Sequence, residues 1–147
     1  MKPLILLLAS GFGSGYSPFA SGTAGSLVAA LLYWFVFPQG NIPLLAIVLV
    51  TLLISVPVCT KAELHYGKKD DGHIVLDEFA GMWITMLFVP PTIGFLIAGF
   101  LLFRLFDVIK PFFRSLQSLP GGWGIMIDDV LAGLLANTVL QAARFFL

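Results

Sequence analysis

Charged residues are scarce in this 147-residue sequence, where Asp, Glu, Lys and Arg together make up 11%. A typical soluble domain carries about 25%. Hydrophobic residues make up 59%, and the mean hydropathy is +0.98. So little charge cannot cover a water-facing surface, and the sequence therefore predicts an integral membrane protein. The eight basic and eight acidic residues give a net charge of zero, which argues against nucleic acid as a partner.

The sequence is also poor in cysteine and has only a short apolar run near its start. Cys59 is the only cysteine, so no intramolecular disulfide can form. Its place at the end of an apolar run favours a small buried side chain. The leucine-rich stretch at residues 4–8 is shorter than the roughly 7–15 apolar residues of a signal peptide. We therefore expect a short amphipathic or interfacial segment there.

Long segments carry no charge, notably residues 3–60 and 79–103. Turns rich in Pro and Gly divide the apolar runs, because these residues interrupt helices. The pattern predicts helices at residues 23–37, 42–59, 74–89, 93–106 and 127–146. These are short beside the roughly 20 residues of a full membrane crossing. The predicted fold is all-α: one domain over residues 1–147, forming a polytopic membrane helical bundle of about five short helices.

The charges gather on one side if successive helices cross the membrane in alternate directions. The segments at residues 61–72 and 104–124 then share a side, and the turns at 38–41 and 90–91 share the other. Neither of these turns contains Lys or Arg. The basic residues that flank helices on the first side are Lys61, Lys68, Lys69, Lys110 and Arg114. The positive-inside rule makes that side cytoplasmic, so the polar chemistry is expected at the cytoplasmic membrane border.

Two pairs of adjacent acids open two of the predicted helices. They are Asp77 with Glu78, and Asp128 with Asp129. Capping of the helix dipole would explain one acid per helix, but adjacent side chains point about 100° apart. Gly81 and Gly133 would let the two helices approach closely and bring the carboxylates together. A divalent cation with oxygen ligands, Mg²⁺ if the substrate carries phosphate, would relieve their repulsion. The spacing alone leaves capping and metal binding equally open.

Three charged residues follow a helical spacing further on. Arg104, Asp107 and Lys110 stand at positions i, i+3 and i+6 and so share one helix face. They could form a local ion ladder, which the spacing alone slightly favours. They could instead hold a phosphate, for which Arg offers a planar fork and Lys a point charge.

A Gly- and Ser-rich segment at residues 11–26 precedes the first predicted helix. Glycines let a backbone approach a ligand, and a helix start offers free N–H groups to an anion. Thr23 and Ser26 could contribute to such a site or could simply cap the helix. The spacing matches neither a Walker loop nor a dinucleotide fingerprint.

The two histidines, His65 and His73, lie in a polar stretch. We interpret them as solvated surface residues rather than ligands. The chain also lacks the order of a Ser-His-Asp triad and has no thiol in a setting that suits a nucleophile.

Four segments together resemble the phosphatidylglycerophosphatase A family of bacterial membrane enzymes: residues 11–26, 74–81, 103–111 and 121–129. They occur in the family's order and span nearly the whole chain. Ser21 departs from the family pattern, which usually has proline there. The resemblance implies hydrolysis of the anionic phospholipid phosphatidylglycerophosphate to phosphatidylglycerol and inorganic phosphate, with Mg²⁺, in the bacterial inner membrane. The charge asymmetry of the loops independently puts the site at the cytoplasmic face of that membrane.

With this resemblance, the motifs receive provisional roles. The expected metal ligands are Asp77, Glu78, Asp128 and Asp129; the expected catalytic acids are Asp77, Asp107 and Asp129; and the expected substrate-binding residues are Thr23, Ser26, Arg104 and Lys110. The resemblance does not say which acid does which job. A small membrane transporter is an alternative, but transporters place binding groups near the midplane, where these helices carry no charge. A non-catalytic assembly subunit is another, although it would not need two acid pairs on one side.

Overall fold

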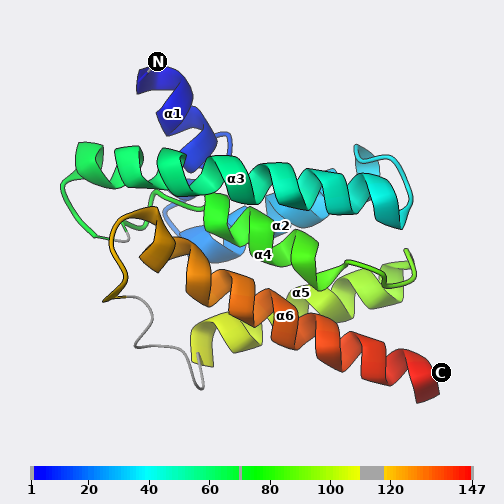
Figure 1. Cartoon of the computed structure of the whole chain (residues 1–147). Helices are drawn as coiled ribbons and strands as arrows, with labels where there is room; N and C mark the ends of the chain where they lie inside the picture. Colours follow the sequence, from blue (N-terminus) through cyan, green and yellow to red (C-terminus); the bar gives the residue numbers. More distant parts are fainter. Residues whose placement is uncertain (1, 70, 110–117, 147) are drawn as a thin grey trace.

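The computed structural model describes residues 2–69, 71–109 and 118–146. These residues form helices and no strand, which confirms the all-α prediction. The helices are α1 (Lys2–Ala9), the short 3-10 helix η1 (Ser14–Tyr16), α2 (Ser21–Phe35), α3 (Asn41–Tyr66), α4 (Leu76–Thr85), α5 (Ile93–Ile109) and α6 (Gly122–Phe146). Helices α2, α4 and α6 run in one direction, and α3 and α5 run in the other (Figure 1).

Two helices are long and apolar enough to cross a membrane. They are α3, with 26 residues, and α6, with 25, against the roughly 20 that a crossing needs. Only 28% of the most apolar window of α3 is buried inside the protein. Leu49, Val50 and Leu53 are exposed on this helix. An apolar surface of this kind suits contact with lipid rather than water.

Helix α4 lies at the centre of the bundle and packs against α2, α3, α5 and α6. All ten of its residues are buried. At ten residues it is too short to cross a bilayer. Its C-terminal end meets α6, where Asn137 donates hydrogen bonds to the carbonyls of Ile84 (3.3 Å), Thr85 (3.0 Å) and Leu87 (2.7 Å). These bonds satisfy backbone acceptors that have no partner within the short helix.

The contact between α4 and α6 depends on two glycines, as predicted. A Cβ atom on Gly133 would lie 2.5 Å from the carbonyl oxygen of Gly81. A Cβ on Gly81 would lie 2.8 Å from the carbonyl oxygen of Asp129 and 2.4 Å from the ring of Phe103. The two backbones can therefore approach this closely only because neither residue has a side chain.

Two predicted helix ends were wrong. Helix α3 continues through Pro57 and beyond residue 59 to Tyr66, so the first part of the expected 61–72 loop is helical. It ends at Gly67, whose φ of 70° is left-handed and suits glycine. Helix α4 ends at Thr85 and not at residue 89, since Asn137 binds its last carbonyls.

The predicted start of α6 was also wrong. The helix begins at Gly122, five residues before the expected residue 127. The N–H of Gly122 donates a 2.7 Å hydrogen bond to the hydroxyl of Thr60 on α3. A side chain from another helix therefore satisfies a group that a local cap would normally bind.

Candidate functional site

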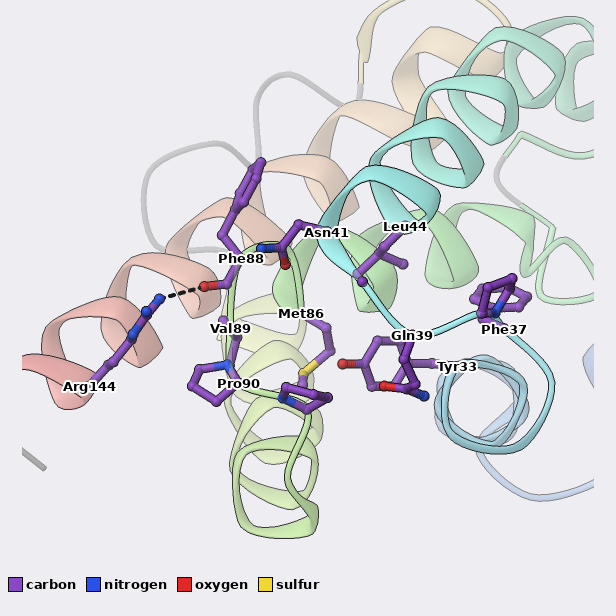
Figure 2. A pocket seen from close by; sticks show the side chains of 13 residues that line it. Tyr33, Phe37, Gln39, Asn41, Leu44, Met86, Phe88, Val89, Pro90 and Arg144 are labelled. Atoms are coloured by element: carbon purple, nitrogen blue, oxygen red, sulfur yellow. Dashed lines mark hydrogen bonds between the residues drawn. The ribbon is translucent and has the colours of Figure 1, made fainter.

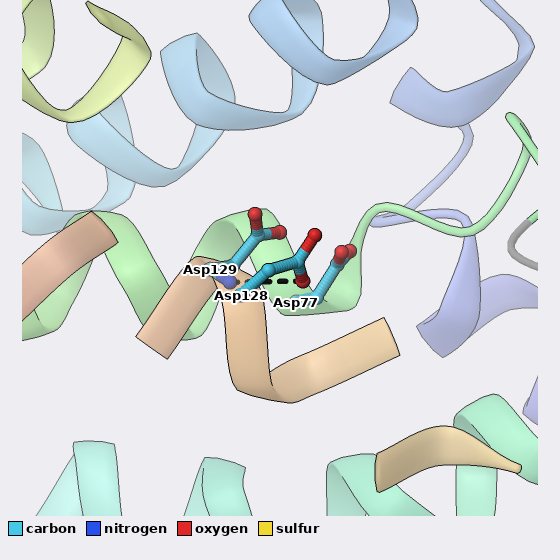
Figure 3. Close-up of side chains that lie close together, drawn as sticks. All are labelled: Asp77, Asp128 and Asp129. Carbon is cyan, nitrogen blue, oxygen red and sulfur yellow. Dashed lines mark hydrogen bonds between the residues drawn. The ribbon is translucent and has the colours of Figure 1, made fainter. Parts of the chain in front are cut away.

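Five buried carboxyl groups meet where α4 and α6 begin and α5 ends. Asp77 and Glu78 lie in the first turn of α4, and the pair Asp128 and Asp129 lies on α6. Asp107 comes from near the end of α5. Each of the five is at most 8% exposed. Figure 3 shows Asp77 of α4 beside the two acids of α6.

The carboxylates form two groups that share Asp129. One oxygen from each of Asp77, Asp128 and Asp129 can be chosen so that all lie within 4.8 Å of one another. Oxygens of Glu78, Asp107 and Asp129 meet the same condition. The fold therefore brings the two predicted acid pairs together and places Asp107 in the same cluster.

The arrangement fits a hard divalent cation. Atom Oδ2 of Asp129 is buried and accepts no hydrogen bond from the described residues. A buried charged oxygen without such a bond is costly in an apolar environment. Several carboxylate oxygens at this spacing are the donor set that Mg²⁺ or a similar cation prefers.

Helix capping does not explain the second acid pair. Asp128 and Asp129 lie in the second turn of α6, and no acid occupies its first turn. The dipole effect is concentrated in the first turn. The expectation that this pair opens its helix was therefore wrong. The pair Asp77–Glu78, in contrast, does occupy the first turn of α4, as expected.

Arg104 compensates part of the negative charge. Its Nη1 donates to Glu78 Oε2 at 2.9 Å and to Asp107 Oδ2 at 2.6 Å. The contact with Asp107 confirms the predicted ion ladder at its first step. Lys110, the second expected cation, lies outside the described residues. The assignment of both cations to phosphate binding stays a prediction.

The start of α2 supports the site from the other side. Ser26 is fully buried, and its hydroxyl donates to Gly22 O (2.9 Å) and to Glu78 Oε2 (3.3 Å). A Cβ on Gly22 would lie 2.8 Å from Glu78 Oε1 and 3.2 Å from the guanidinium of Arg104. The backbone of α2 is therefore in close contact with both charged groups.

The helix-capping alternative for Thr23 and Ser26 was wrong, because Ala20 occupies the N-cap position of α2. Thr23 is half-buried in the first turn and does not line the pocket beside the acids. Ser26 holds Glu78 and is itself inaccessible. Direct substrate binding by either residue stays a prediction.

The acids open onto a cavity of about 190 Å³. Its remaining lining residues are Ser21, Gly22, Asp71, Gly72, Ile74 and Val75. The sequence analysis missed Asp71 and Ser21 as site residues. The loop that carries Asp71 packs closely on the η1 region: a Cβ on Gly15 would lie 2.1 Å from the carbonyl oxygen of His73. No local sequence pattern reports such a contact.

A second cavity, of about 320 Å³, lies beyond the C-terminal end of α4, and Figure 2 shows the side chains that line it. None of its lining residues is Asp or Glu. Its one charged side chain, Arg144, donates to the carbonyl oxygen of Phe88 at 2.9 Å. This cavity therefore offers no carboxylate ligand for a metal ion.

The chain as a whole is similar to known proteins. A family model for phosphatidylglycerophosphatase A matches residues 7–144. The phosphatidylglycerophosphatase A of Escherichia coli is 41% identical over 91% of this chain and 80% of its own length. That of Haemophilus influenzae is 38% identical over 97% and 90%. A Bacteroides thetaiotaomicron protein, provisionally named a phosphatidylinositol-3-phosphatase, is 38% identical over 97% and 94%. No solved structure matches the chain.

Proposed function

Since this chain belongs to the phosphatidylglycerophosphatase A family, we propose that it hydrolyses phosphatidylglycerophosphate to phosphatidylglycerol and inorganic phosphate, with Mg²⁺. The observation that carries the proposal is the pair of overlapping carboxylate groups beside a polar cavity. A phosphate monoester at the end of a lipid head group is small enough to enter such a cavity. Its negative charge requires a cation before it can approach five acids.

Asp77, Asp128 and Asp129 are the first set of metal ligands, and Glu78 and Asp107 complete a second set with Asp129. When bound, Mg²⁺ would polarise the phosphoryl group and activate water. Asp129 belongs to both sets, so its loss should affect the whole site. The Asp128 side chain accepts a hydrogen bond from the backbone N–H of Asp129 at 3.0 Å, which helps to fix the pair (Figure 3).

Arg104 and Asp107 of α5 would perform the rest of the chemistry. Arg104 holds Asp107 and Glu78 through Nη1, and its other guanidinium N–H groups would bind a phosphoryl oxygen as a fork. Asp107 is then positioned to orient water and to accept a proton from it. Lys110 would add a second positive charge for the phosphate. An intermediate on Asp77 or Asp129 is the alternative course.

We place the acidic end of the bundle at the cytoplasmic border of the bacterial inner membrane. Lys61 and the exposed Lys68 and Lys69 lie at the end of α3 on that side, where the positive-inside rule expects cations. In a Cys59→Ala background, a cysteine at Lys68 should react with an impermeant reagent only from the cytoplasm, and one at Gln39 only from outside. Reaction of both from one side would contradict this orientation.

A second candidate substrate comes from the name of the Bacteroides relative. A phosphoinositide also carries a phosphate monoester on a polyhydroxyl head group, so the same carboxylates could serve it. The test is phosphate release by the purified full chain from phosphatidylglycerophosphate and from phosphatidylinositol 3-phosphate, with Mg²⁺ and after chelation.

We expect release from phosphatidylglycerophosphate that stops on chelation and returns with Mg²⁺. If the protein prefers the phosphoinositide, the proposed substrate is wrong, but the proposed reaction, hydrolysis of a lipid phosphate monoester, stands. Release that persists in excess chelator would overturn the metal mechanism. If the protein releases phosphate from neither lipid, the proposed function is wrong, and the transporter and the assembly subunit become the explanations to test.

A further inference from the structure

Asp71 differs from the five clustered acids in where it lies. It lines the same cavity, yet it belongs to neither group of carboxylates that could hold a metal. Its side chain is 15% exposed. It therefore lies on the more exposed side of the cavity, its mouth, on the loop between α3 and α4.

The carboxylate is held in a fixed position. Its Oδ1 accepts a 2.9 Å hydrogen bond from the backbone N–H of His73 and a second contact from the His73 ring. That ring stacks on Tyr66 at 5.0 Å between centroids and contacts Tyr16 at 4.6 Å. The two tyrosine hydroxyls are hydrogen-bonded to each other. His73 thus contacts two aromatic rings while its side chain stays 43% exposed, so it is partly solvated, as expected, and is also held in place.

The chemistry of Asp71 suits a hydroxyl donor. Partial burial would raise its pKa, but the hydrogen bonds from His73, with the charge of Lys68, hold the pKa below its usual value. The group is therefore ionised at neutral pH and only accepts hydrogen bonds. It would repel a phosphate, whereas an alcohol O–H would bind to the oxygen that His73 leaves available.

Ser21 provides a second polar group at the same mouth. It lines the cavity with Asp71, and a Cβ on Gly72 would lie 3.7 Å from its hydroxyl oxygen. The Ser21 hydroxyl therefore lies beside the loop that carries Asp71. A serine hydroxyl both donates and accepts, so the pair can bind a hydroxyl that does the same.

We propose that Asp71, assisted by Ser21, binds the free hydroxyl of the head-group glycerol and thereby determines which lipid phosphomonoesters are hydrolysed. The inference rests on the proposed function. In phosphatidylglycerophosphate this hydroxyl is on the carbon next to the one that carries the phosphate. With the phosphoryl group among the clustered acids, the hydroxyl comes to the mouth of the cavity. Asp71 is thus a specificity-determining residue, and His73 positions it.

The test compares phosphatidylglycerophosphate with its deoxy analogue, in which hydrogen replaces that hydroxyl. Replacing Asp71 by Ala should lower kcat/KM about ten-fold for the natural lipid, since one charge-assisted hydrogen bond is lost. It should leave kcat/KM for the analogue unchanged. Asp71→Asn keeps the bond to the His73 backbone and should show the same selective loss if Asp71→Ala folds poorly. Glu63→Gln, an acid-to-amide change on α3 outside the cavity lining, is the matched control.

Equal losses on both lipids, or a parent protein that hydrolyses both equally well, would overturn the role of Asp71. If the analogue turns over too slowly to measure, its inhibition constant replaces kcat/KM in the same comparison. A parent protein that hydrolyses neither lipid would instead contradict the proposed function. The two failures are therefore distinguishable.

Discussion

Polar groups gather at both the C-terminal and the N-terminal end of α4, but the two ends differ in how these groups are paired. At the C-terminal end, Asn137 and Gln141 of α6 donate to backbone carbonyls, and Arg144 donates to Phe88 O. Each of these neutral carbonyl oxygens therefore accepts a hydrogen bond from a side-chain donor of α6. At the N-terminal end, five carboxyl groups lie together and Arg104 pairs with two of them, Glu78 and Asp107. Asp129 Oδ2 accepts no hydrogen bond from the described residues.

We infer that the difference separates stability from function along one ten-residue helix. Satisfied backbone acceptors keep a short buried helix in place. Crowded carboxylates do the opposite unless a cation joins them. Natural proteins retain such local conflicts mainly at functional sites. Substitutions at the two ends should therefore affect different measurements.

The largest effect is expected at the shared acid. Asp129→Asn removes a ligand from both carboxylate groups, so kcat/KM for phosphate release should fall about a thousand-fold, or several kcal/mol of transition-state stabilisation. The melting temperature without Mg²⁺ should not fall, because a repulsive charge is removed. Glu63→Gln should keep its activity. An active Asp129→Asn enzyme would show that the acidic end is structural.

A smaller effect is expected for the cation at the same end. Arg104→Lys keeps a positive charge near Glu78 and Asp107 but loses the fork that suits phosphate. We expect kcat/KM to fall roughly 10- to 100-fold, as for the loss of one charge-assisted bond. Membrane yield and melting temperature should stay close to those of the parent. If kcat/KM also stays unchanged, Arg104 serves only the ion ladder, and Lys110 becomes the main phosphate contact.

The smallest effect on activity is expected at the C-terminal end of α4. Asn137→Leu leaves backbone carbonyls without their donor and should reduce the free energy of unfolding by about 1–3 kcal/mol. The activity of the folded fraction should not change, since the carboxylates are at the other end of α4. Thermal unfolding in detergent, beside kcat/KM, checks both. The control is Thr138→Ala at the exposed neighbouring residue. If Asn137→Leu lost activity without being destabilised, the division of α4 into a stabilising end and a functional end would be wrong.

Much of the fold could be predicted from local patterns, whereas helix ends set by tertiary contacts could not. The apolar runs gave the helical class, and Gly81 and Gly133 predicted the close approach of α4 and α6. The hydroxyl of Thr60 binds Gly122, 62 residues away in the chain, and Asn137 binds Thr85 from 52 residues away. A sequence window contains only one partner of such a pair, so the expected ends were misplaced.

The site shows the same limit. An acid in an apolar segment indicates a special role because burial of its charge is costly. Asp77 and Asp129 could be selected from the sequence for that reason. Asp71 lies in a polar stretch where charge is ordinary. Only the packing of Tyr16 and Tyr66 around His73 gives it a fixed place at the cavity. Sequence reasoning therefore singled out Asp77 and Asp129, which are unusual in an apolar segment, and did not single out Asp71, which is ordinary in a polar one.

The most direct measurement is the melting temperature of the purified protein as a function of Mg²⁺ concentration, for the parent and for Asp129→Asn. A cation that binds only the folded protein raises its stability as its concentration exceeds the dissociation constant. The account predicts that Mg²⁺ raises the melting temperature of the parent and leaves that of Asp129→Asn unchanged. A parent protein whose melting temperature does not respond to Mg²⁺, or an equal rise in both proteins, would contradict the assignment of the carboxylates as the metal site.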